Sequence, residues 1–160
     1  MIDSSYRHRL KGIPVLDEQI IFSSIEAALV DFLTSRLIEP SSSVTVATRT
    51  PEPRPSRMVR VSRNDRKYLL DLEDYPSRRG ANRILDRPRV VFECFDDSGD
   101  AVELASKVRG IINAAAPGYI GTVWCDYVED VGEENDTDPV TAAPRYTIVT
   151  DLIVRGKVLA

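Results

Sequence analysis

Residues whose chemistry could support catalysis are few in this sequence and lie far apart. His8 is the single histidine, and Cys94 and Cys125 stand outside any Cys-x-x-Cys pairing. A Ser-His-Asp triad, a multi-histidine metal centre or a zinc site needs several such groups brought together. We therefore predict no catalytic residue, no metal site, no cofactor and no enzymatic activity. We interpret both cysteines as reduced thiols in the core.

Carboxylates are the next group that could do chemistry. Asp71 and Glu73 share a strand face if a strand over residues 67–72 continues by one residue, and paired carboxylates can hold a divalent ion. A second cluster consists of Glu133, Glu134, Asp136 and Asp138. It lacks the loop glycine and the terminal glutamate of a calcium-binding EF-hand. We interpret the pair as solvated charge at a sheet edge and the cluster as part of an acidic loop over residues 129–144.

Arginines form the most regular series of charged residues in the chain. The series, with a spacing of three residues, is Arg54, Arg57, Arg60, Arg63 and Arg66. Strand-prone runs at 58–62 and 67–72 flank Asn64-Asp65, which predicts a basic hairpin. Such a hairpin could meet nucleic-acid phosphates or an acidic protein surface. Few aromatic residues lie nearby, so stacking on single-stranded bases is weakly supported.

The charges are segregated along the chain, although the net charge is only −4. Residues 49–89 hold twelve Lys/Arg against six Asp/Glu, whereas residues 93–138 hold two against twelve. A helical turn at 81–85 would also make Arg79 and Arg83 neighbours. Opposed blocks can attract across a head-to-tail contact between copies, and such attraction weakens with salt. The alternative is that both blocks are simply solvated faces.

The elements that must position these charges can be read from apolar periodicity and caps. Ser23 and Glu26 form a capping box that begins a first helix, and Pro40 blocks its continuation. A second helix begins near Ser98 and ends at Pro117. Strands are predicted at 44–48, 58–62, 67–72, 90–95, 120–128 and 145–155, with a proline-rich loop at 51–55.

These elements predict a single α+β domain with a mixed or antiparallel sheet of about four to six strands, two flanking helices and a protruding basic hairpin. Residues 1–22 are expected to form an extended arm, and residues 23–160 the domain. The predicted core contains Leu29, Phe32, Phe92, Leu104, Val108, Ile111, Trp124, Tyr146, Ile148 and Leu152. No apolar run approaches the roughly 18 residues of a membrane span, so we expect a soluble protein.

The order and spacing of five segments resemble the tail terminator proteins of long-tailed bacteriophages, especially those that infect actinobacteria. The segments are IEAALVDFL (25–33), MVRVSR (58–63), LDRPRVVFECF (85–95), AVELASKVRGII (101–112) and PRYTIVTDLIVRG (144–156), together with the acidic stretch before the last. The resemblance covers roughly residues 23–157. The arm at 1–22 has no counterpart in it.

The resemblance implies a subunit of a ring, a hexamer by analogy, that caps the tail tube and stops its growth. Its partners would be other copies of itself, the tail tube protein and the head-completion protein. Genomic DNA would pass through the lumen without specific binding, and no membrane would be involved. The location would be the head-tail junction of a virion assembled in the bacterial cytoplasm.

Two alternatives stay open at this stage. The first is another head-tail connector, a head-closure protein or a minor tail protein. The second is a small nucleic-acid-binding domain that uses the Arg54 to Arg66 hairpin. For a ring, the interface candidates are the five arginines of that series, Arg79, Arg83 and the carboxylates Glu133, Glu134, Asp136 and Asp138.

Overall fold

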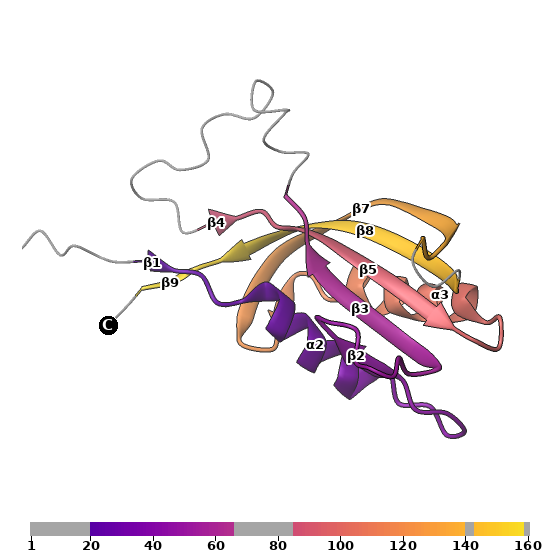
Figure 1. Cartoon of the computed structure of the whole chain (residues 1–160). Coiled ribbons are helices and arrows are strands. Elements are labelled where there is room, and N and C mark those ends of the chain that lie inside the picture. The colour runs from indigo at the N-terminus through magenta and orange to yellow at the C-terminus, as the bar shows by residue number, and fades with distance from the viewer. Residues whose placement is uncertain (1–19, 66–84, 140–142, 159–160) are drawn as a thin grey trace, which may run out of the picture.

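The computed structural model describes residues 20–65, 85–139 and 143–158, and within them it shows a single α+β domain with two helices and a curled mixed sheet (Figure 1). The helices are α2 (Ile25–Arg36) and α3 (Ala101–Asn113). The strands are β1 (Ile20–Ile21), β2 (Thr45–Ala47), β3 (Arg57–Arg63), β4 (Leu85–Asp86), β5 (Arg89–Asp96), β6 (Gly118–Ile120), β7 (Val123–Thr137), β8 (Pro144–Arg155) and β9 (Lys157–Val158).

The main sheet has the strand order β2-β3-β5-β8-β7-β6, and β4 pairs with β8 off this path. Only β2 and β3 are parallel, while the other neighbours are antiparallel. A separate two-stranded pair joins β1 to β9, so the start of the described chain lies beside its end. Ile20 and Ile21, which belong to the arm predicted over residues 1–22, form this pair with β9. Residues 1–19 of the predicted arm lie outside the described residues.

Helix α2 begins one residue later than its sequence signal indicates. The cap is Ser24, whose side-chain oxygen accepts a hydrogen bond from the backbone N–H of Ala27 at 3.3 Å. The predicted capping box of Ser23 and Glu26 is wrong, because the Glu26 carboxylate accepts instead from the backbone N–H of Arg63 at 2.6 Å. This bond ties the first turn of α2 to the end of β3.

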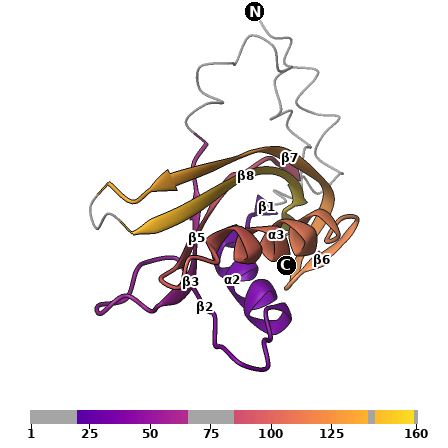
Figure 2. The same cartoon turned by 90° about the vertical axis from the view of Figure 1, so that its right-hand side faces the viewer.

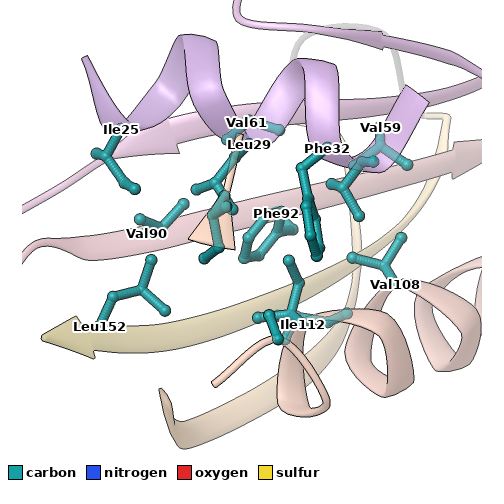
Figure 3. Packing of buried hydrophobic residues seen from close by; sticks show 14 of the residues in the cluster. Ile25, Leu29, Phe32, Val59, Val61, Val90, Phe92, Val108, Ile112 and Leu152 are labelled. Carbon is teal, nitrogen blue, oxygen red and sulfur yellow. The ribbon is translucent and has the colours of Figure 1, made fainter. Parts of the chain in front are cut away.

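Both helices pack on one face of the sheet, and the main core lies between the two layers (Figures 1 and 2). Strand alternation sends Val90, Phe92 and Cys94 of β5 to this face, where all three are fully buried, as the sequence predicted. Figure 3 shows the cluster, with Phe92 in its middle and residues of α2 and α3 around it. The helix face of the sheet is therefore a closed apolar layer.

The predicted core residues are confirmed with one exception. Leu29, Phe32, Phe92, Leu104, Val108, Ile148 and Leu152 are buried, and Ile111 and Tyr146 are partly buried against them. Trp124 is the exception, since it is only half-buried and lies outside the core cluster. Its ring packs edge-to-face on Tyr119 with centroids 4.9 Å apart, and its indole N–H donates to Asp126 at 3.0 Å. An indole needs a partner for this N–H, which favours the sheet margin over the apolar centre.

Two predictions for residues 120–144 are wrong. The strand predicted over 120–128 is two strands, because the chain reverses at Gly121, whose φ of +59° few other residues adopt, so that Ile120 pairs with Val123. The acidic loop predicted over 129–144 is largely strand, because β7 runs to Thr137 and pairs with β8 along its length. Acidic residues have low strand propensity, but the ladder to β8 overrides it.

The basic hairpin at 58–72 is not seen in the described residues. Its first strand is present as β3, which lies within the sheet between β2 and β5, while residues 67–72, Asp71 and Glu73 lie outside the described ranges. The hairpin that projects is instead the acidic one formed by β7 and β8, whose distal ends extend past the helices in Figure 2.

Candidate assembly surface

The sheet face turned away from the helices, here called the outer face, carries a chain of ion pairs across four strands. Glu93 of β5 contacts Arg60 of β3 on one side and accepts from Arg145 of β8 at 2.9 Å on the other. Arg145 continues to Asp136 of β7, with Nε to Oδ1 at 3.0 Å. Hydrogen bonds from Arg145 hold the pKa of Asp136 below its usual range. The chain links neighbouring strands through their side chains as well as their backbones.

A second group of charges crosses the same face nearer the other end of the strands. Arg89 donates to both oxygens of Asp151, at 2.9 and 3.0 Å, in the bidentate geometry that strengthens such pairs. Arg87 reaches Glu129 of β7 at 2.9 Å. Asp151 is only 3% exposed, so removing either charge alone would leave a poorly solvated partner.

A third junction ties the helix layer to the sheet. Glu39, just beyond α2, accepts from Arg57 of β3 and from Lys107 of α3, both at 2.8 Å. Arg57 also contacts Asp96 at the end of β5. Hydrogen bonds from Arg57, Lys107 and Ser42, in that order, lower the pKa of Glu39 to about 2. The ionised carboxylate is thus held by cations from two different layers.

Replacing Glu39 with glutamine is expected to lower the free energy of unfolding by about 2 kcal/mol at pH 7. The full pKa shift would correspond to roughly 3 kcal/mol, but Lys107 is 43% exposed and water screens its share. Because the folded pKa lies below the unfolded one, this stability is present above pH 4.5 and is lost as the pH falls toward 2. Urea unfolding of both proteins at several pH values measures the difference.

The matched control is Glu103→Gln, which removes only an exposed pair with Lys107 within one helix. It is expected to cost less than about 0.5 kcal/mol. If the Glu39→Gln protein were as stable as the Glu103→Gln protein at neutral pH, the Glu39 junction would make no contribution to the free energy of unfolding.

The β7–β8 hairpin combines a long strand with many carboxylates. Arg109 of α3 contacts Asp130 and also donates to Glu133 at 2.7 Å, which anchors the middle of β7 to the helix layer. On its outer side, β7 is paired by β6 only from Val123 to Cys125, and beyond Cys125 no strand of the described ranges pairs with this edge. The edge from Asp126 to Thr137 is therefore open.

The predicted interface arginines are occupied within the chain. Arg54 pairs with Asp97, Arg57 with Glu39 and Asp96, Arg60 with Glu93, and Arg63 with Asp65 and Asp86. Three of these carboxylates, Glu93, Asp96 and Asp97, belong to the acidic residues 93–138, so the two charge blocks meet inside one molecule. Arg66, Arg79, Arg83 and His8 lie outside the described residues. A contact of these arginines with a neighbour's Glu133 to Asp138 stays a prediction.

The acidic candidates divide according to their partners. Asp136 and Glu133 are paired with Arg145 and Arg109, and Asp138 closes the hairpin with its backbone N–H donating to Ala143 at 2.9 Å. Glu134 is exposed and has no ion-pair partner among the described residues. It is therefore the candidate whose charge is most available to another molecule.

The two cysteines and two surface hollows are the remaining features of the described residues that bear on chemistry. Cys94 and Cys125 are free and buried as predicted, and burial raises the pKa of the Cys94 thiol to about 12, so it stays protonated at neutral pH. Across the described ranges, no three His, Cys, Asp or Glu side chains gather in a way that could hold a metal ion. A polar hollow of about 570 Å³ is lined by the Glu39 junction, and a second of about 470 Å³ lies between the ends of α2 and α3.

Comparison of the chain with protein-family models and with curated proteins finds no match. Neither helix has the length and apolar character needed to cross a membrane, as far as the described residues go.

Sequence reasoning missed the importance of Glu93, Asp151 and Arg145. A signal was available for the first two, because each is a lone carboxylate inside an apolar strand, in VVFECF and IVTDLIV. Such residues are almost never fully buried unless they are paired. The identity of each partner depends on strand order and register, which no local pattern specifies.

Proposed function

We propose that this chain is a structural subunit that assembles into a closed ring, and that it acts as the tail terminator of a long-tailed bacteriophage. The observation that carries the proposal is the projecting β7–β8 hairpin with its open outer edge from Asp126 to Thr137. An unpaired strand edge of this length can accept an added strand. Proteins protect such edges by shortening, covering, charging or bulging them, and β7 uses only the last two, which leaves its backbone groups accessible among the described residues.

The size of the subunit supports a ring. A globule of this length has a radius of gyration of about 15 Å, so one copy cannot surround duplex DNA. A channel for DNA requires several copies that meet through two different surfaces, since such heterologous contacts close into rings. The order and spacing of the five sequence segments quoted above, which resemble those of tail terminators, also support the proposal. The acidic hairpin is compatible with two placements in such a ring. It would either line a channel through which DNA passes without binding, or lie at the interface between copies.

The charge of the hairpin supports a heterologous contact over a two-fold one. Two β7 edges placed side by side would bring Glu129, Glu133 and Glu134 of one copy against the same acidic residues of the other. Like charges on adjacent strands are destabilising. The edge therefore favours a basic partner surface.

Direct nucleic-acid binding through the Arg54 to Arg66 series has less support. The guanidinium groups of Arg54, Arg57, Arg60 and Arg63 already contact carboxylates of the same chain. Binding phosphates would require these pairs to open. A nucleic-acid-binding domain would bind random duplex with a steep dependence of affinity on salt.

Electron microscopy of the chain mixed with polymerised tail tube protein from the same phage tests the proposal. The expected result is a ring at one end of each tube and a loss of overlong tubes when the chain is present during polymerisation. The control is polymerisation without the chain. Tubes with bare ends and unchanged lengths, together with tight salt-sensitive binding to random duplex, would favour the nucleic-acid alternative.

A further inference from the structure

The open edge of β7 offers unpaired backbone groups over an unusually long distance. β8 pairs with the inner side of β7 from Cys125 to Thr137, and the pairing of the short β6 reaches no further than Cys125. In the described part of the chain, the groups from Asp126 to Thr137 that point outward have no strand beside them. Register shifts between Cys125 and Tyr127 and between Asp130 and Gly132 interrupt the edge, so an added strand could form a hydrogen-bonded ladder over Gly132 to Thr137.

The charge of this edge restricts which strand can be added. The carboxylates along it are Asp126, Glu129, Asp130, Glu133, Glu134 and Asp136, and the cations that contact them are Arg155, Arg87, Arg109 and Arg145. Two of these cations are shared with carboxylates elsewhere, since Arg145 also binds Glu93 and Arg87 also approaches Asp151. The edge retains negative charge, so a strand with basic residues on one face would match it.

The chain itself carries such a segment outside the described residues. Residues 6–11 read Tyr-Arg-His-Arg-Leu-Lys, so basic and non-basic residues alternate with the period of a strand. In an extended conformation, Arg7, Arg9 and Lys11 share one face. No other stretch of the sequence places three Lys or Arg residues at positions i, i+2 and i+4.

We propose that residues 6–11 of one copy add as a strand to the outer edge of β7 in the neighbouring copy. The inference rests on the proposed ring, for which it supplies the contact between subunits. Residues 12–19 separate this segment from β1 and can span roughly 27 Å when extended. The contact joins two different surfaces, and such contacts generate a ring when the rotation between copies closes and an open filament when it does not.

Cysteine cross-linking of full-length chains tests the contact directly. One chain carries Arg9→Cys and a second, with a different tag, carries Glu134→Cys. Arg9 is the middle basic residue of the segment, and Glu134 is exposed and has no ion-pair partner among the described residues. Mild oxidation of the mixture is expected to join the two chains at least five-fold more than it joins Arg9→Cys to Ile38→Cys, a control on an 80% exposed residue. The native chain, with its two buried thiols, gives the background.

A single chain that carries both Arg9→Cys and Glu134→Cys separates the two possible sources of the strand. If a neighbour supplies it, cross-linked dimers and larger species form, and their fraction rises with concentration. A cross-link formed within one chain at every concentration would mean that each copy covers its own edge, which overturns the proposal.

Charge exchange provides a readout that does not depend on oxidation. Arg7→Glu, Arg9→Glu and Lys11→Glu together are expected to weaken self-association by at least ten-fold in sedimentation velocity. Mixing this variant with a second chain that carries Glu129→Lys and Glu134→Lys is expected to restore much of the lost association. Unchanged association of the first variant would overturn the proposal.

The tube experiment and the cross-link together distinguish this inference from the proposed function. Capped tubes without the Arg9 to Glu134 cross-link would overturn this inference alone. Cross-linked rings that leave tube ends bare would overturn only the tail-terminator function.

Discussion

Replacing Phe92 with alanine is expected to lower the free energy of unfolding by about 4 kcal/mol, the largest effect we predict for a single substitution. Phe92 is fully buried in the middle of β5, and the helix layer covers it (Figure 3). The loss combines the transfer free energy of the aromatic ring with the cavity that it leaves, because packed neighbours relax only in part. Thermal unfolding of a chain of this length should shift downward by about 10 °C.

The control for Phe92→Ala is Ile38→Ala, at an apolar residue that is 80% exposed. That substitution is expected to change stability by less than about 0.5 kcal/mol. Equal effects of the two substitutions would mean that the helices do not cover β5 as described.

Replacing Glu93 with alanine is expected to cost about 3 kcal/mol, although Glu93 is a charged residue on the face without helices. Its side chain is 10% exposed and holds Arg145, which is itself only 14% exposed, together with Arg60. Removing the carboxylate leaves Arg145 poorly solvated and takes away one of its two ion-pair partners, with Asp136 as the other. Breaking a buried ion pair from one side is costly for this reason, even where the intact pair adds little net stability. Urea unfolding with an unchanged m-value would measure the loss.

The control for Glu93→Ala is Asp97→Ala, which removes a carboxylate that is 50% exposed and paired with Arg54. The expected cost is below about 1 kcal/mol. A Glu93→Ala protein as stable as Asp97→Ala would show that the outer-face charges are freely solvated and that their pairs have no structural role. Phe92 and Glu93 are adjacent in sequence, so the two predictions probe opposite faces of the same strand.

The intramolecular pairing of the arginines changes how the charge segregation of the sequence should be interpreted. The basic residues 54–63 bind carboxylates that include Glu93, Asp96 and Asp97 of the acidic block. Much of the attraction expected between copies is therefore used within one copy. Among the described residues, the open edge of β7, where Glu134 lacks an ion-pair partner, is the part of the acidic block that the proposed contact between copies could use. A salt-sensitive contact between copies is expected at that edge.

The sequence alone determined the helices and the buried strands. Apolar residues recur at helical spacing in α2 and α3, and the alternation in β5 and β8 assigns their faces correctly, because burial of one side is a local, repeating property of the chain. The sequence did not determine where α2 begins. Its cap depends on whether the Glu26 carboxylate binds the backbone of its own helix or that of Arg63, which lies 37 residues away.

Only the tertiary structure decided which charges meet and which edge stays open. Arg60 and Glu93 are 33 residues apart, and Arg145 and Glu93 are 52 apart, so their pairing follows from strand order and register. The same ladder turned acidic residues 129–137 into a strand, although their side chains do not favour one. Local composition records what each residue prefers alone, whereas backbone hydrogen bonds to β8 and long-range ion pairs set the free energy of the conformation that these residues adopt.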